Sequence, residues 1–127
     1  MRLRFIAVLA VIAALAVSGV ALAASSSSKT IVKPTKVTVT LKDYSFTFSK
    51  PYVKKGKKAL TVIFTVKNAG SVQHNIDFVP LNKRSAIIAP GAKTTLKVVF
   101  KKKGSFQVVC DVPRHIQLGM VSSFKIA

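Results

Sequence analysis

The chain opens with one long apolar run and then changes to short segments in which apolar and polar residues alternate. Residues 5–17 are uninterrupted apolar positions preceded by Arg2 and Arg4, and Ala21-Leu22-Ala23 offers the small residues of a signal-peptidase site. This order predicts an export signal over residues 1–23. An uncleaved membrane anchor is the alternative reading, because about 20 apolar residues suffice to cross a bilayer.

From residue 36 onward the apolar positions recur with the period of two that a half-buried strand requires. Val37, Val39 and Leu41 alternate with Thr and Lys, and Tyr44, Phe46 and Phe48 continue in the same register. Further strands are predicted over residues 60–67, 74–79, 94–100, 105–110 and 120–126, with turn residues between them. Residues 81–88 fit either a loop or a helical turn.

No segment after the export signal keeps a helical period, so the predicted fold class is all-β, a Greek-key β-sandwich of about seven to eight strands. Residues 24–35 are polar and lack periodicity, and we expect them to form a flexible lead into the domain. The domain itself is predicted over residues 36–127. About 100 residues is a common size for one domain, and we expect a monomer.

The charge balance is strongly basic. The chain has 21 Lys and Arg against 3 Asp and Glu, a net charge of +18 with His neutral. Such a surface favours an acidic partner protein or an anionic cell surface by raising the rate of encounter. The presence of any single lysine can also be explained by its role in keeping a small apolar domain soluble. Nucleic acid is not expected as a partner, because the chain is predicted to be exported and has no recognition motif or basic helix with interleaved aromatics.

Cys110 is the single cysteine of the chain. Exported proteins meet oxidising conditions, in which thiols usually pair, and here no second cysteine is available within the molecule. Cys110 is therefore a buried inert thiol, one half of an intermolecular disulfide, or a metal ligand.

The spacing of the Cys, His and Met residues favours a metal-ligand role for Cys110. Cys110, His115 and Met120 are separated by two four-residue gaps, between the last two predicted strands, and His74 lies 36 residues before Cys110 at a predicted strand start. Each residue alone has an ordinary packing role, but every Cys and His and every Met after Met1 belongs to this one pattern. Two imidazoles, a thiolate and a thioether are the donor set that suits copper in both oxidation states.

These motifs resemble those of the cupredoxins, the blue copper proteins of the plastocyanin and azurin type. The resemblance covers residues 36–127, and the two four-residue gaps are most similar to those of rusticyanin and auracyanin. The residues that carry it are the Pro90-Gly91 turn, the Gly104-Ser105-Phe106 approach to Cys110, the Gly119-Met120 pair and His74-Asn75.

The resemblance implies a protein that carries single electrons on one type 1 copper ion, in the periplasm or outside the cell, and that is not an enzyme. His74, Cys110 and His115 would be the strong equatorial ligands and Met120 the long axial one. Asn75 would tie the two ligand-bearing segments together. Electrons would pass through a partly exposed His115, surrounded by a docking patch of Pro113, Arg114, Ile116 and Leu118, to an acidic redox partner.

Two residues depart from the family pattern. Many cupredoxins have Gly immediately before the second histidine and Gly after the axial methionine, whereas this chain has Arg114 and Val121. Arg114 puts a cation on the expected docking face, where it favours acidic partners and also hinders close approach.

Other functions fit parts of the pattern. A copper storage or delivery protein would use the same ligands without electron traffic. A thiol enzyme would pair Cys110 with His115 as its base, but the sequence offers no orienting third group. A metal-free adhesion domain would stay colourless in Cu(II). Zinc is an alternative, adventitious metal for the same site, because His and Cys also bind zinc.

Overall fold

A computed structural model describes Ala23, Ser25 and residues 32–127 of the chain. The predicted export signal, apart from Ala23, and most of the predicted lead lie outside these residues. Among the residues described, no helix has the length and hydropathy needed to cross a membrane.

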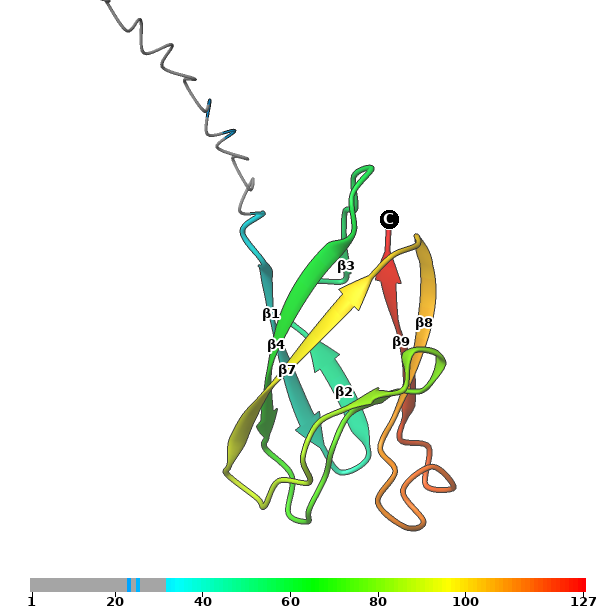
Figure 1. The fold of residues 1–127 in the computed structure, drawn as a ribbon. Coiled ribbons are helices and arrows are strands. Elements are labelled where there is room, and N and C mark those ends of the chain that lie inside the picture. Colours follow the sequence, from blue (N-terminus) through cyan, green and yellow to red (C-terminus); the bar gives the residue numbers. More distant parts are fainter. Residues whose placement is uncertain (1–22, 24, 26–31) are drawn as a thin grey trace, which may run out of the picture. The chain divides into compact units, whose positions relative to one another are not determined.

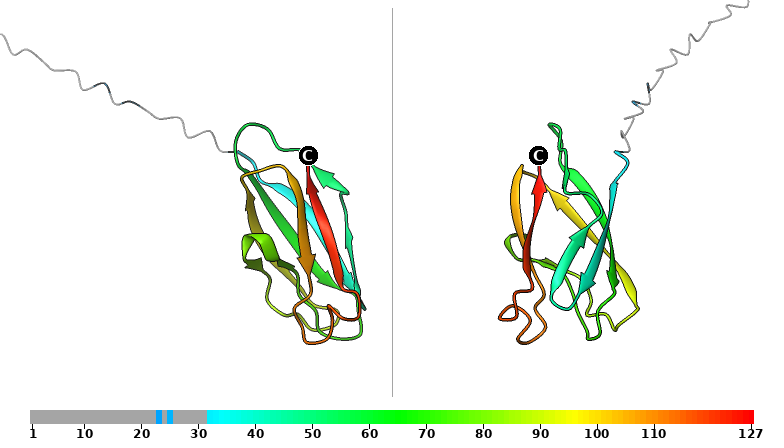
Figure 2. Two further views of the ribbon diagram at one scale, coloured as in Figure 1. Left: turned by 90° about the vertical axis from the view of Figure 1, so that its right-hand side faces the viewer. Right: turned by 180° about the vertical axis from the view of Figure 1, so that it is seen from behind.

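Two mixed sheets form a β-sandwich (Figures 1 and 2). The first has the strand order β2-β1-β4-β7, and the second has the order β3-β9-β8-β5-β6. The strands are β1 (Thr35–Lys42), β2 (Ser45–Phe48), β3 (Tyr52–Val53), β4 (Leu60–Asn68), β5 (Asp77–Phe78), β6 (Lys83–Arg84), β7 (Lys93–Phe100), β8 (Gly104–Val109) and β9 (Val121–Ile126). A single 3-10 turn, η1 (Val79–Leu81), is the one helical element among the described residues.

The predicted all-β sandwich is confirmed, and the structure adds strands to the expected number. The described residues form nine strands, of which β3, β5 and β6 have only two residues each. Strands this short leave almost no alternation in a sequence, so the pattern cannot reveal them. The ambiguous residues 81–88 contain the end of η1 and the short strand β6.

The period of two buries one face of each long strand. In β1, the residues Val37, Val39 and Leu41 are at most 1% exposed, while the residues between them are not buried. Phe64 of β4 contacts Phe78 and Phe124 of the opposite sheet at ring-centroid distances of 5.0 and 5.2 Å. Large aromatic surfaces such as these supply most of the apolar burial that a small domain needs.

The predicted continuous register from Val37 through Phe48 is wrong, because these residues belong to two antiparallel strands. The chain reverses at Asp43 and Tyr44, and β2 returns antiparallel to β1 with Phe48 opposite Val39. The sequence does indicate this turn. Leu41 and Tyr44 are separated by an odd number of positions, which breaks the period of two.

Several connections gather at one end of the sandwich. The β1–β2 turn, the segment after β4 and the orange loop between β8 and β9 all reach the lower end in Figure 1, away from the C-terminus. The fold thus brings together segments that are far apart in the sequence, and these segments hold the four residues of the predicted metal site.

Candidate metal centre

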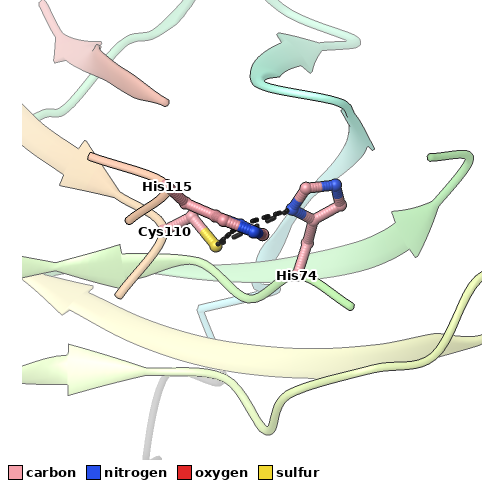
Figure 3. Close-up of side chains that lie close together, drawn as sticks. All are labelled: His74, Cys110 and His115. Carbon is pink, nitrogen blue, oxygen red and sulfur yellow. Dashed lines mark hydrogen bonds between the residues drawn. The ribbon is translucent and has the colours of Figure 1, made fainter. Parts of the chain in front are cut away.

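Two imidazoles and one thiol converge on one buried point at this end of the domain (Figure 3). The ligating atoms of His74, Cys110 and His115 all lie within 4.8 Å of one another. Cys110 Sγ is 3.4 Å from Nδ1 of His115 and 3.8 Å from Nδ1 of His74, and the two Nδ1 atoms are 3.1 Å apart. The structure thus brings together three of the four side chains that the sequence pattern grouped.

The backbone of His74 is fixed by an isolated β-bridge and does not belong to a strand. The strand predicted over residues 74–79 is only Asp77–Phe78, and His74 forms an isolated antiparallel bridge with Ile88. The His74 N–H donates to the Ile88 carbonyl at 3.2 Å, and the Ile88 N–H donates back at 2.9 Å. This pair of hydrogen bonds fixes the backbone of His74 beside the loop that carries the other donors.

The loop from Cys110 to Met120 folds back on itself. The Cys110 N–H donates to the Met120 carbonyl at 3.2 Å, and the Met120 N–H donates to the His115 carbonyl at 3.0 Å. Because β8 pairs Val109 with Val121, Cys110 and Met120 are opposite each other when the ladder is extended by one residue. Opposite residues of an antiparallel pair project from the same face, and both side chains have no exposed surface. A role for Met120 as the fourth ligand remains a prediction.

Asn75 links the two segments that carry His74 and Cys110. Its backbone N–H points at Cys110 Sγ at 3.4 Å. Its side-chain amide donates to Asp111 Oδ1 at 2.5 Å, and the Asp111 N–H donates to Asn75 Oδ1 at 3.0 Å. Arg84 then pairs with the other oxygen of Asp111 at 2.9 Å. This geometry fits the linking role that the family resemblance implied for Asn75.

Two residues of the site were missed by the sequence analysis. Asp43 Oδ1 lies 2.7 Å from Nε2 of His74, and the ring of Tyr44 meets the His115 ring edge-on at 5.0 Å. Both belong to the β1–β2 turn, which is 31 residues from His74 in sequence. The break in the period of two between Leu41 and Tyr44 was the available signal.

The expected exposure of His115 is wrong. His115 is only 7% exposed, and the Tyr44 ring packs against it. The residues around it are open: Ile116 is 46% and Leu118 is 54% exposed, and Pro113 and Arg114 are exposed as well. Tyr44, Pro113, Arg114, His115, Gln117 and Leu118 line a surface hollow there.

Arg114 has a backbone conformation that favours glycine. Its φ angle is 73°, in the left-handed region that an L side chain adopts at a cost of about 1 kcal/mol or more. This gives a physical reason why the many cupredoxins with glycine at this position tolerate the turn more easily than a chain with arginine.

The surroundings change the pKa values of the site. Burial raises the pKa of the Cys110 thiol above its ordinary 9.0, and burial, together with the nearby His74, lowers the pKa of His115 below 6.5. Hydrogen bonds from Ser71 and from His74 hold the pKa of the Asp43 carboxyl far below its usual range. Without a metal, the site therefore favours a neutral thiol and a neutral His115 imidazole beside an ionised Asp43.

The donor set fits a soft or borderline metal ion. A thiolate and two imidazole nitrogens suit copper or zinc, and a thioether such as that of the buried Met120 favours copper. Binding would require Cys110 to lose its proton, so the protein would release protons when a metal binds.

Comparisons with known proteins identify the family and the fold. The family model described as "Cupredoxin-like domain" matches residues 8–121. A search of curated protein sequences finds no match.

Solved structures share the fold at low sequence identity. Reduced auracyanin from the photosynthetic bacterium Roseiflexus castenholzii is 18% identical with a TM-score of 0.53, over 76% of this chain and 99% of that one. Auracyanin B is 15% identical with a TM-score of 0.54, over 76% and 91%. The periplasmic domain of cytochrome oxidase subunit II from Bradyrhizobium japonicum is 12% identical with a TM-score of 0.58, over 73% and 83%.

The raised pKa of Cys110 predicts an alkaline loss of stability in the metal-free protein. The unfolded thiol ionises near its ordinary pKa of 9.0 while the folded thiol keeps its proton, so the free energy of unfolding should fall as pH rises above that value. One proton contributes at most about 1.4 kcal/mol per pH unit. Urea titrations of the chelator-treated protein measure the slope, and a Cys110→Ala variant with the same slope would contradict the assignment.

The left-handed backbone of Arg114 predicts that glycine stabilises the loop. Arg114→Gly should raise the free energy of unfolding by about 0.5–1 kcal/mol. Glycine relieves the backbone strain of the folded state, and the greater conformational entropy that it gives the unfolded chain offsets part of this gain. Arg114→Ala removes the same charge but keeps a Cβ, and it should give no such gain. Equal stabilities for the two variants, measured by urea unfolding, would rule out the backbone explanation.

Proposed function

This chain belongs to the cupredoxin-like domain family, and we propose that it is an exported type 1 copper protein that carries single electrons. His74, Cys110 and His115 would be the equatorial ligands and Met120 the axial one. The resemblance read from the motifs is confirmed for the family and the fold. The electron-carrier function and the ligand roles are proposed from the site.

One observation carries the proposal: Nδ1 of both histidines and the Cys110 sulfur share one buried volume. Two imidazoles and a thiolate in a trigonal arrangement, with a weak methionine, define an electron-transfer copper site. Met120 follows Gly119 and lies directly opposite Cys110 in the extended β8–β9 ladder, which places it on the same face as the thiol.

The protein's own contribution to electron transfer is rigidity. Copper supplies a one-electron change between two oxidation states when it is bound. The loop is closed by the Cys110–Met120 and Met120–His115 backbone hydrogen bonds, and His74 is pinned by Ile88. Donors fixed in this way move little when the charge of the ion changes, which keeps the cost of each electron transfer low.

Burial of the donors favours electron transfer over copper storage or delivery. Handing copper to another protein requires that an incoming ligand reach the ion, but His74 and Cys110 have no exposed surface and His115 has 7%. An electron needs no such opening. It can pass through the edge of His115, at which Ile116 and Leu118 form an exposed apolar rim.

The lysine-rich surface supports an acidic redox partner. The chain carries a net charge of +18, and Arg114 is exposed beside the hollow over His115. A field of this sign attracts negative partners and orients them, and salt screens it over about 8 Å at physiological ionic strength.

Copper loading gives the direct test. The mature protein with one equivalent of Cu(II) should show an intense visible thiolate charge-transfer band, together with the paramagnetic-resonance spectrum of a type 1 site. Cys110→Ser should abolish the band, since a hydroxyl cannot replace the thiolate, and the zinc-loaded protein should be colourless. A wild-type protein that stays colourless in Cu(II) would refute the proposal.

Electrostatic steering predicts that electron transfer depends on salt. Oxidation of the Cu(I) protein by ferricyanide, a small anion, should slow as ionic strength rises, and oxidation by a cationic cobalt(III) complex should accelerate. Arg114→Gln should slow the ferricyanide reaction roughly threefold at low salt. Lys102→Gln removes the same charge at the other end of the sandwich and serves as the matched control; equal effects would exclude a docking role for Arg114.

A further inference from the structure

The few acidic residues of this chain are concentrated at one place. The sequence has 3 Asp and Glu residues in 127, namely Asp43, Asp77 and Asp111. Asp111 and Asp77 are both paired with Arg84, and Asp111 also accepts a hydrogen bond from the Asn75 amide. Asp43 alone among them contacts one of the proposed ligands, His74.

The contact between Asp43 and His74 determines which ring nitrogen carries a proton. Asp43 Oδ1 and His74 Nε2 are 2.7 Å apart. An ionised carboxylate can only accept hydrogen bonds, so Nε2 must be the donor. In the neutral ring this leaves the lone pair on Nδ1, the atom that faces Cys110 and His115. The proton on one side of the ring thus prepares the other side for a metal.

Asp43 is itself held on several sides. The Ser71 N–H lies 3.1 Å from Oδ1 and 2.9 Å from Oδ2, and the Ser71 hydroxyl donates to Oδ2. The Asn68 amide fixes the same segment by donating to the carbonyls of Val72 and Ile88 at 2.8 and 2.9 Å. Because Ile88 also pins His74, the carboxylate and the imidazole share one rigid frame.

Gly70 makes the close approach possible. A Cβ on this residue would lie 2.8 Å from His74 Nε2 and closer still to Asp43 Oδ1. Any side chain here would push the two groups apart. The glycine is therefore required by the contact between carboxylate and imidazole, in the way that glycine permits close approaches generally.

We propose that Asp43 is the positioning residue of His74 and that its negative charge stabilises Cu(II) relative to Cu(I). A carboxylate that accepts the second N–H of a metal-bound histidine fixes the ring and makes it a stronger donor. A negative charge beside the site also favours the ion of higher charge. The inference rests on the proposed copper site, and a histidine–aspartate pair with only a structural role would have neither effect on the metal.

Two variants separate the charge of Asp43 from its hydrogen bond. Asp43→Asn keeps the size and an acceptor oxygen, and Asp43→Ala removes both. We expect the ratio of Cu(II) to Cu(I) affinity to fall about tenfold in Asp43→Asn, which raises the reduction potential by about 59 mV. Asp43→Ala should in addition weaken the binding of both ions by about 10–100-fold. Competition with chelators for each ion and direct voltammetry give the two readouts.

Asp77→Asn is the matched control, since it makes the same change of charge at a carboxylate that contacts Arg84 and no proposed ligand. It should change the affinity ratio less than twofold. Urea unfolding of each metal-free variant identifies any loss that comes from the fold alone.

The outcomes distinguish this inference from the function on which it rests. A wild-type protein without the blue band overturns both. If the wild-type protein is blue but neither Asp43→Asn nor Asp43→Ala changes the affinity ratio or the potential from the wild-type values, the role of Asp43 alone is overturned. An effect of Asp77→Asn equal to that of Asp43→Asn overturns it as well.

A spectroscopic measurement on the native chain gives an independent test. Cu(I) is diamagnetic, so the Cu(I) protein can be studied by nuclear magnetic resonance with nitrogen-15 histidine. The Nε2 proton of His74 should appear far downfield and exchange slowly with water, because it is buried in a hydrogen bond to a carboxylate. A fast-exchanging proton at this position would overturn the proposal.

Discussion

The pairing of β5 with β8 is the constraint on which the site depends. Asp77 lies opposite Val109 and Phe78 opposite Val108. Two residues further along the same register, Asn75 lies opposite Asp111, and their side chains and backbone exchange hydrogen bonds. A slip of one residue would turn every side chain of this pair of strands to the other face and would separate His74 from Cys110.

The aromatic core keeps this pairing in place. Phe78 of β5 is fully buried and packs against Phe64 at 5.0 Å and Phe100 at 5.8 Å, both from the opposite sheet. A two-residue strand could not hold its register by hydrogen bonds alone, so packing across the sandwich must supply the rest. Cys110 and Met120 belong to the same core. The stability of the fold and the geometry of the site thus depend on one set of contacts.

Basic and acidic residues serve different functions in this molecule. The chain has 21 basic residues against three acidic ones, and this balance suits encounters with negative partners. The carboxylates are kept at the site end, in contact with His74, Asn75 and Arg84. A chain with so few acidic groups has little negative charge elsewhere to weaken the attraction of an acidic partner.

The sequence by itself determined the all-β class, the buried faces of the long strands and the grouping of Cys110, His115 and Met120. Period-two alternation and ligand spacing are local properties, and they can be read along the chain. Tertiary structure decided that Asp43 and Tyr44 meet the two histidines, that His115 is buried, and that Arg114 has a left-handed backbone. These features depend on turns and on contacts between residues 31 or more positions apart, such as Asp43 and His74. A pattern along the chain carries no record of which distant residues the packing of two sheets will bring together.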